Sequence, residues 1–374
     1  MDAAKPSLDM LRSLTDEHVL RALMAHRRLT RAELATRTGI SKPTISESVR
    51  RLGAAGLVAD TGERTTGRGR VGSYYGLAPG LGCALVLGVA PEGVVAETVD
   101  AHGDVLGRAA EPVARPARPA EVAEAVRAAV RDARGGPARP VRLAVVSAAD
   151  PVDRATGRLV HLPDAPFLLG ELSPVDLLAE FGPVVVDNDV NWAARAERAA
   201  ADPPADDFAY LHLGEGLGCA VVHDGDVRRG HGGLVGEIAH VLTTGPDGAA
   251  LPFTEVFAAL GLRRPGSTAI DVVALRARTG TRAGAPVLAA LTRAVGGVLA
   301  AVVALADPAF VVVAGTWGAD PAVLDALTAE LRRLPRPVAV RPPSVTDEPS
   351  LAGARADAVA RLRTTITAGS GPRP

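Results

Sequence analysis

The stretch Thr30–Thr44 reads TRAELATRTGISKPT and decides how the first part of this 374-residue chain folds. Thr30 and Glu33 have the spacing of a capping box, in which the threonine hydroxyl accepts from the backbone N–H of the glutamate and the carboxylate reaches back to the cap. A helix is therefore expected to continue to about Thr38. Gly39 follows, and glycine ends helices because it adopts the left-handed backbone conformation without steric cost.

A helix and a hairpin flank this stretch. Apolar residues recur at helical spacing before it, at Leu11, Leu14, Val19, Leu20 and Leu23. Ser41 is expected to cap a third helix with Pro43 in its first turn, where the missing N–H costs nothing. Strands are expected from Gly56 and over Ser73–Leu77, joined by a Gly- and Arg-rich loop at Gly62–Gly72. This order of elements is that of a winged helix-turn-helix.

The charge of the chain is divided unevenly. Residues 1–80 hold thirteen Lys and Arg against eight Asp and Glu, a net charge of +5, and the remainder carries −6. A basic head on an acidic body favours local nucleic-acid contact. Duplex DNA would be contacted by hydroxyls and cations of the third helix and the hairpin: Ser41, Lys42, Thr44, Ser46, Arg50, Arg64, Arg68 and Arg70. The alternative is a small helical protein-interaction domain with a solvated charged face.

Strands and helices alternate from about Gly82 onward. The expected strands are Cys83–Val89, Gly93–Val99, Val105–Ala109, Val141–Ser147, Val184–Asp187, Phe208–Leu213, Cys219–His223 and Phe310–Ala314. The expected helices are Glu121–Arg134, Asn191–Ala201, Phe253–Leu260, Ile270–Arg278, Ala285–Asp307 and Ala322–Leu334. The alternation recurs after about residue 205, which predicts two α/β lobes around a cleft near residues 187–240. The predicted domains are a head at 1–80, a two-lobed body at 81–366 and a loose tail at 367–374.

Cysteine content and apolar runs exclude several classes of protein. The two cysteines, Cys83 and Cys219, exclude a disulfide framework and a multi-cysteine zinc site. The first twenty residues lack the pattern of a signal peptide, and runs such as Val295–Leu305 are too short to cross a membrane. A cytoplasmic protein without a membrane partner is expected.

Two polar motifs mark a candidate ligand site. Asn188 and Asp189 follow a buried strand, and side chains at the carboxyl ends of α/β strands face ligand crevices. An amide and a carboxylate suit the vicinal hydroxyls of a sugar, although Asp189 is equally well placed to begin the next helix. Glu237 and His240, which follow the glycines of Gly232–Gly236, are three apart and would share one face of a helical turn. A carboxylate and an imidazole side by side could bind the hydroxyl groups of a ligand or, less well, a metal ion. The alternative is that His240 has only a structural role.

A third motif, Gly214-Glu215-Gly216-Leu217-Gly218, has the glycine spacing of a turn that cradles phosphate. Glu215 does not fit that task because its carboxylate would repel phosphate. A tight hairpin turn is the favoured interpretation.

Taken together, these motifs in this order resemble the transcriptional-regulator branch of the ROK family (repressors, open reading frames and sugar kinases). The resemblance implies an N-terminal winged helix-turn-helix followed by an α/β, two-lobed sugar-kinase/actin-like (ribonuclease H-like) domain. It also implies that a hexose in the cleft is held by five side chains: Asn188, Asp189, Glu237, His240 and Glu255.

The chain departs from the kinases of this family at their nucleotide motifs. Gly88–Glu92 stands where kinases have an Asp-x-Gly-Gly-Thr loop, Glu215 replaces a threonine, and only Ala314–Thr316 remains of a Gly-rich turn. We therefore expect no ATP, no cofactor and no enzymatic activity. No zinc is expected either, because the stretch after His240 lacks cysteine, and Ala149-Asp150 replaces a Pro-Gly turn near the sugar.

The sequence thus predicts a sugar-responsive, DNA-binding regulator, a repressor acting as a homodimer or dimer of dimers on an inverted repeat. Three alternatives stay open. The protein would be a regulator that has lost sugar binding and answers to a protein or phosphorylated partner, or a constitutive DNA-binding protein whose body only dimerises. The third is an active hexose kinase in which Asp189 is the base.

Overall fold

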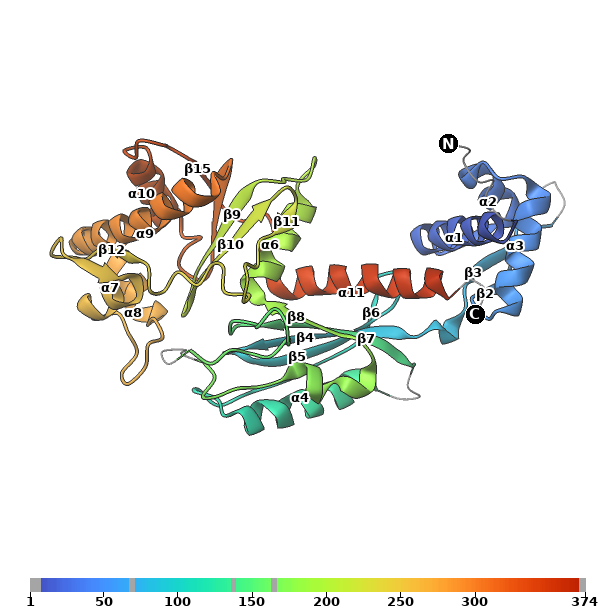
Figure 1. The fold of residues 1–374 in the computed structure, drawn as a ribbon, viewed down its shortest axis with the longest axis horizontal. Coiled ribbons are helices and arrows are strands. Elements are labelled where there is room, and N and C mark those ends of the chain that lie inside the picture. The colour runs from blue at the N-terminus through green and yellow to red at the C-terminus, as the bar shows by residue number, and fades with distance from the viewer. Residues whose placement is uncertain (1–7, 67–70, 136–138, 163–166, 370–374) are drawn as a thin grey trace.

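The computed structural model describes residues 8–66, 71–135, 139–162 and 167–369, which form three parts along the long axis of the molecule. We call them the head (residues 8–80), lobe 1 (83–188) and lobe 2 (208–341). A long C-terminal helix, α11 (Pro349–Ala368), runs between them (Figure 1). The winged head and the two α/β lobes confirm the predicted fold class.

The head contains three helices and a three-stranded sheet. The helices are α1 (Leu8–His26), α2 (Arg31–Thr38) and α3 (Lys42–Ala54). The strands lie in the order β1 (Arg28–Thr30), β3 (Ser73–Leu77) and β2 (Val58–Arg64), followed by a short 3₁₀ turn at Pro79–Leu81. The capping box is formed, and Gly39 ends α2 with φ of 70°. Ser41 caps α3 as predicted.

A buried polar contact fixes α1 to α3. The Asp16 carboxylate is 5 % exposed and accepts from Ser48 and from Arg51 at 2.6 Å. Pairing compensates the cost of burying the carboxylate, so this contact holds α3 against α1.

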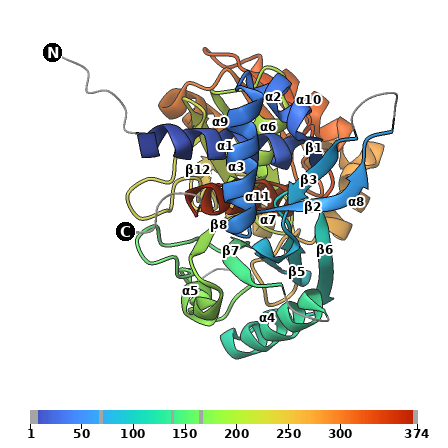
Figure 2. The ribbon, with the colours of Figure 1, turned by 90° about the vertical axis from the view of Figure 1, so that its right-hand side faces the viewer.

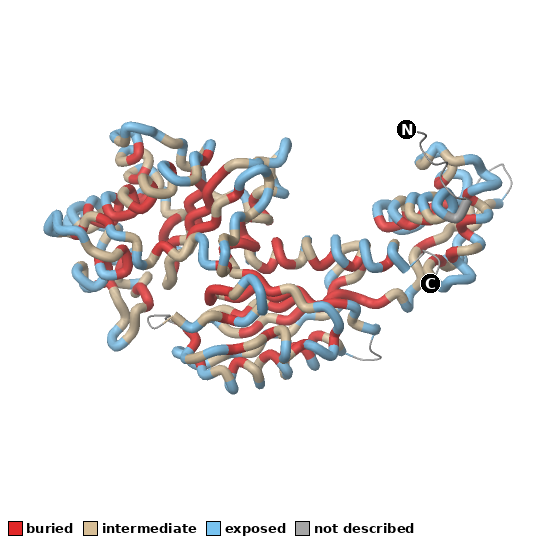
Figure 3. Tube along the Cα trace, viewed as in Figure 1, coloured by how far each residue is buried: buried red, intermediate tan, exposed pale blue. Residues whose placement is uncertain are grey.

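Lobe 1 is a five-stranded sheet covered on both faces. The order is β6 (Val105–Glu111), β5 (Gly93–Val99), β4 (Cys83–Ala90), β7 (Val141–Ala148) and β8 (Val184–Asn188), with β4, β7 and β8 parallel. Helix α4 (Pro119–Arg134) covers one face and α11 the other (Figures 1 and 3). A short helix α5 (Pro174–Leu177) and a 3₁₀ turn (Ala179–Phe181) precede β8.

Lobe 2 repeats this topology. Its order is β11 (Asp226–Val227), β10 (Leu217–His223), β9 (Phe208–Leu213), β14 (Phe310–Ala314) and β15 (Ala339–Arg341), which is again third, second, first, fourth and fifth in chain order. The hairpin β12 (Leu242–Thr244) and β13 (Ala250–Pro252) precedes four helices and a 3₁₀ turn. These are α7 (Phe253–Ala259), α8 (Val272–Thr279), the turn at Arg282–Gly284, α9 (Ala285–Ala306) and α10 (Pro321–Leu331).

The expectation that the apolar runs are too short to cross a membrane is wrong for Arg282–Ala306, which is long and apolar enough, although half of its most apolar part is buried inside the structure. Val295, Val298 and Leu299 of α9 lie in the core of lobe 2 with β9 and β14. We interpret α9 as a core helix.

Helix α6 (Asp189–Ala200) joins the two lobes. Val190, Ala193 and Ala194 pack on the sheet of lobe 2 beside Phe208 and Tyr210. Trp192, on another face of α6, lies in the core that α11 forms with lobe 1 and donates from Nε1 to Val146 O at 3.0 Å. Helix α6 therefore contacts both lobes and α11.

Helix α11 was not predicted, and it changes the C-terminal boundary. It runs through Thr367 and Ala368, so the expected loose tail at 367–374 is wrong for these two residues. Its buried Leu362 and Ile366 belong to a core that also contains Leu20 and Leu23 of the head. The head is therefore joined to lobe 1 by a shared apolar core.

Candidate functional site

The candidate DNA surface is the exposed side of α3, which lies across the end of the molecule away from lobe 2 (Figure 2). Lys42 and Thr44 are exposed in its first turn, and Ser46 is half-buried. The Ser41 hydroxyl accepts from the backbone N–H of Thr44 at 3.4 Å and lies 2.7 Å from its hydroxyl. The N-terminus of α3 thus gathers hydroxyls and a cation at the positive end of the helix dipole, which suits a phosphate.

Two arginines predicted to reach DNA are held by neighbouring acids. Arg50 pairs with Glu47 at 2.6 Å and Arg64 with Asp60 at 2.9 Å. Exposed ion pairs contribute only about 0–1 kcal/mol, so a phosphate can displace the acids. Arg68 and Arg70 lie outside the described residues.

The candidate ligand site is a cleft of about 660 Å³ between the lobes. Lobe 1 contributes the ends of three strands through Glu92, Asp150 and Asn188. Lobe 2 contributes His212, the turn Gly214–Gly218, Glu237 and His240. The first turn of α11 also reaches the cleft through Pro349 and Ser350. The structure therefore brings together four of the five predicted sugar-binding side chains: Asn188, Asp189, Glu237 and His240.

Asn188 caps α6 and lines the cleft. Its Oδ1 accepts from Val190 N at 2.9 Å, and its Nδ2 donates to the carbonyls of Ala148 and Asp150 at 3.4 Å each. The motif therefore begins α6, with Asn188 as the N-cap, while its role in holding a ligand stays a prediction. Asp189 is the first residue of α6, and burial raises the pKa of its carboxyl group.

Glu237 and His240 come from an irregular loop, so the predicted helical turn is wrong. Two glycines with positive φ shape that loop, Gly233 at +92° and Gly236 at +97°. A Cβ at Gly236 would lie 1.7 Å from Cys219 O of β10, so only glycine fits where the loop crosses this strand. Both polar side chains still line the cleft.

Glu255 does not join the other four residues. It lies on α7, and its carboxylate accepts from Arg263 at 3.0 Å. It is absent from the described lining of the cleft, where its neighbour Thr254 stands instead. The position implied by the resemblance is therefore not at the ligand surface in this conformation.

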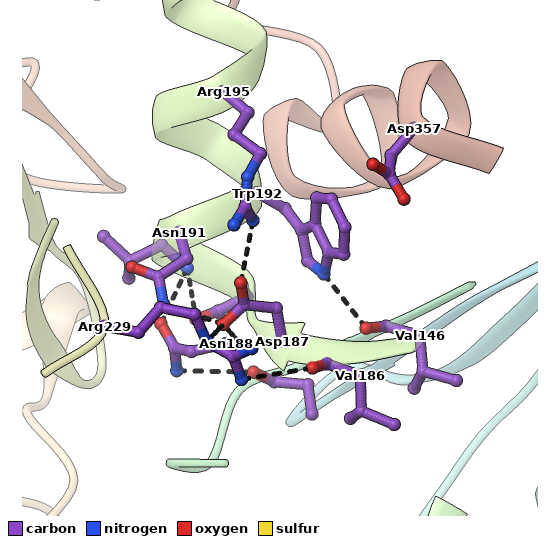
Figure 4. Close-up of polar contacts among 12 residues, drawn as sticks. Val146, Val186, Asp187, Asn188, Asn191, Trp192, Arg195, Arg229 and Asp357 are labelled. Atoms are coloured by element: carbon purple, nitrogen blue, oxygen red, sulfur yellow. Dashed lines mark hydrogen bonds and ion pairs between the residues drawn. The ribbon is translucent and has the colours of Figure 1, made fainter. Parts of the chain in front are cut away.

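Asp187 has a role that the sequence did not reveal. Its carboxylate is 2 % exposed and accepts from Asn191 and Arg195 of α6, both at 2.8 Å. Arg229, at the start of the loop that carries Glu237, lies 3.2 Å from the same carboxylate and donates to Val186 O at 3.4 Å (Figure 4). Asp187 therefore ties the strand end that carries Asn188 to the loop from lobe 2.

Glu215 lies in the predicted hairpin turn, since β9 and β10 pair around it with Leu213 opposite Leu217. Its carboxylate pairs with Arg115 of lobe 1 at 3.1 Å and with Arg264 of lobe 2. Two guanidinium groups therefore offset the negative charge of Glu215, which the sequence did not reveal. The Arg115–Glu215 pair also bridges the lobes across the cleft.

One group of described side chains has the composition of a metal site. Asp207, His223 and Asp224 bring ligand atoms within 4.8 Å of one another on an exposed hairpin of lobe 2. His240 is not part of this group.

Comparisons with known proteins agree with the architecture. A model described as "ROK family" matches residues 94–360, and one described as "Winged helix-turn-helix DNA-binding" matches residues 12–59. A solved ROK family transcriptional regulator, a homologue of the E. coli MLC protein, superposes with a TM-score of 0.63 at 17% identity, covering 96% of this chain and 99% of that one. A ROK family glucokinase from Streptomyces griseus, solved with glucose and AMPPNP, gives 0.56 at 25% identity over 74% of this chain and 99% of its own.

Curated sequence relatives match over a short segment only. A glucokinase of Halalkalibacterium halodurans is 41% identical over 69 residues, which is 18% of this chain and 21% of that protein. An N-acetylmannosamine kinase of Escherichia coli O1:K1 is 40% identical over 68 residues, or 18% and 23%. The chain thus matches about a fifth of the length of these kinases.

Proposed function

Because this chain belongs to the ROK family and carries a winged helix-turn-helix ahead of its ROK domain, we propose that it is a transcriptional repressor controlled by a sugar. The sugar binds in the cleft through Asn188, Asp189, Glu237 and His240, without phosphate transfer. A homodimer places two copies of α3 in successive major grooves of an inverted repeat, roughly 34 Å apart. We place this activity in the cytoplasm, with the DNA.

The observation that carries the proposal is the course of α11. Its first turn lines the cleft at Pro349 and Ser350, and its last turns share a core with the head. Twenty residues of α-helix span about 30 Å, so one rigid element connects the two sites. Near the far end of α11, Arg363 Nε donates to Ala101 O at 2.8 Å.

Polar contacts fix the head to the same end of lobe 1. The guanidinium of Arg27 pairs with Asp104 in the β5–β6 turn. In that turn, His102 Nδ1 lies 3.3 Å from Met24 O of α1. Because α11 and the head are both held to lobe 1, a change in the angle between the lobes moves the head relative to lobe 2. A sugar that binds one lobe arrangement more tightly shifts the population toward it and changes operator affinity.

The proposal is tested by selecting an operator from genomic fragments with the full chain and titrating the complex with a sugar panel in gel-shift assays. At least one sugar is expected to change operator affinity by fivefold or more, within the usual range of allosteric coupling of about 1–3 kcal/mol. Asn188→Ala should bind operator normally and lose the response. A panel without effect would contradict sugar sensing, and the absence of a selected operator would contradict DNA binding.

A hexose kinase is the second candidate function, favoured by the matches to a glucokinase and an N-acetylmannosamine kinase. It predicts ADP release from MgATP with some sugar, abolished by Asp189→Asn. We expect no release, because Glu92 and the ion-paired Glu215 occupy the turns where family kinases hold phosphate. Release that depends on Asp189 would replace our proposal.

Lys42→Ala tests the DNA surface. Losing one phosphate contact in each protomer of the dimer should weaken operator binding and reduce the slope of log K against log salt by about 1.8, or about 0.9 per contact. Binding at several salt concentrations by fluorescence anisotropy measures this slope. Arg127→Ala removes an exposed cation from α4 on lobe 1 and should leave the slope unchanged. Equal slopes for Lys42→Ala and the wild-type protein would place the DNA surface elsewhere.

A further inference from the structure

Asp150 is the most unusual group in the cleft. It follows β7 and is 3 % exposed, and among the described residues no donor reaches its Oδ2. A buried carboxylate without a partner is costly, so such a group marks a position where a ligand supplies the missing donor. Asn188 contacts only the backbone carbonyl of Asp150, which leaves the carboxyl group free of that residue.

The surroundings of Asp150 call for a positive charge. Burial, and then the neighbouring Asp189 carboxylate, raise the pKa of Asp150 to about 7. The wall of the cleft on lobe 1 also includes the apolar Pro151, Leu162 and Phe167. A cation between the two acids would lower the free energy of both ionised carboxylates, whereas a neutral hydroxyl would leave their repulsion in place.

Three arginines that line the cleft are engaged away from Asp150. Arg115 and Arg264 pair with Glu215, and Arg276 donates to Thr316 O. His212 lowers the pKa of Asp189, partly opposing the effect of burial. Since no donor among the described residues reaches Asp150 Oδ2, the positive charge beside it is expected to come with the ligand.

We propose that the cleft selects a sugar bearing a free amino group, whose ammonium donates to Asp150 Oδ2 and to Asp189. This inference rests on the proposed function, since it names the class of sugar that the cleft takes. It makes Asp150 a specificity-determining residue, while Asn188, Glu237 and His240 hold the hydroxyls.

The test is calorimetric titration of the full chain with matched triplets of sugars. Each triplet contains a parent hexose, its 2-amino-2-deoxy form and the N-acetylated form, in the gluco, galacto and manno series. N-acetylation removes the charge, so at least one amino sugar should bind about tenfold or more tightly than both partners of its triplet. Asp150→Asn should lower the affinity for that amino sugar by about 10- to 100-fold, which corresponds to the loss of a hydrogen bond to a charged group. The affinity for the parent hexose should change little.

Controls separate this inference from the proposed function. Asp176→Asn alters an exposed acid outside the cleft and should change no affinity. If thermal melting shows that Asp150→Asn does not fold, Asp150→Gly replaces it in the test. This variant removes the carboxyl group and leaves no buried polar side chain in its place. Tighter binding of a neutral hexose or N-acetyl sugar would overturn the amino-sugar inference and leave sugar sensing standing. Binding of no sugar in the panel would overturn both.

Discussion

Replacing Asp187 with alanine is expected to lower the free energy of unfolding by about 3–5 kcal/mol, the cost of breaking a buried ion pair from one side. The carboxylate lies among Asn191, Arg195 and Arg229. Its removal leaves these donors without their acceptor at the junction of the two lobes (Figure 4). The loop carrying Glu237 and His240 should also loosen, so sugar affinity should fall together with stability.

Urea unfolding followed by fluorescence measures this loss. Asp187→Asn retains one acceptor oxygen, so its free energy of unfolding should fall less than that of Asp187→Ala. Asp325→Ala, on the exposed side of α10, should stay within about 0.5 kcal/mol of the wild-type protein. A loss below 1 kcal/mol for Asp187→Ala would mean that the cluster does not hold the lobes together.

The elements that the sequence predicted are those with strong local signals. The capping box at Thr30 fixed the start of α2, and the strands predicted over Ser73–Leu77 and Phe208–Leu213 have those bounds in the structure. Strand β1 was missed because three residues are too few to show the alternation of apolar and polar side chains that marks a strand. Helix α11 was missed because three of its seven buried positions, Gly353, Ala354 and Ala358, are glycine or alanine, which give a weak apolar signal.

The sequence predicted those residues of the candidate site that belong to short motifs. Asn188 and Asp189, placed at a strand end, do reach the cleft. The ion pairs could not be predicted, because Glu215 and Arg115 are 100 residues apart and come from different lobes. Glu255 does not reach the cleft for a more local reason, since its carboxylate pairs with Arg263 eight residues further along the chain. Long-range pairing decides which polar side chains face a ligand, and local spacing does not encode it.

Gly353→Ala is expected to destabilise the protein by about 1–3 kcal/mol, although alanine is the better helix former by about 1 kcal/mol. A Cβ at this position would lie 2.0 Å from the carbonyl oxygen of Trp192. That oxygen belongs to the backbone of α6 and cannot turn away, so α6 and α11 would have to separate. Because these two helices connect the cleft to the head, the variant should also lose the response of operator binding to sugar.

Two measurements check this, urea unfolding and the operator titration with sugar. Trp192 is 1 % exposed and reports on the crossing directly through its fluorescence. Gly53→Ala in α3 is the matched control, because a Cβ at Gly53 would have only Val58 O nearby, at 3.8 Å. Since alanine is the better helix former, this substitution should leave the stability unchanged or raise it slightly. If Gly353→Ala proved as stable as the wild-type protein and kept its sugar response, the close contact between α6 and α11 could not be the route from the cleft to the DNA. Coupling would then have to run through the Arg115–Glu215 pair or the dimer interface.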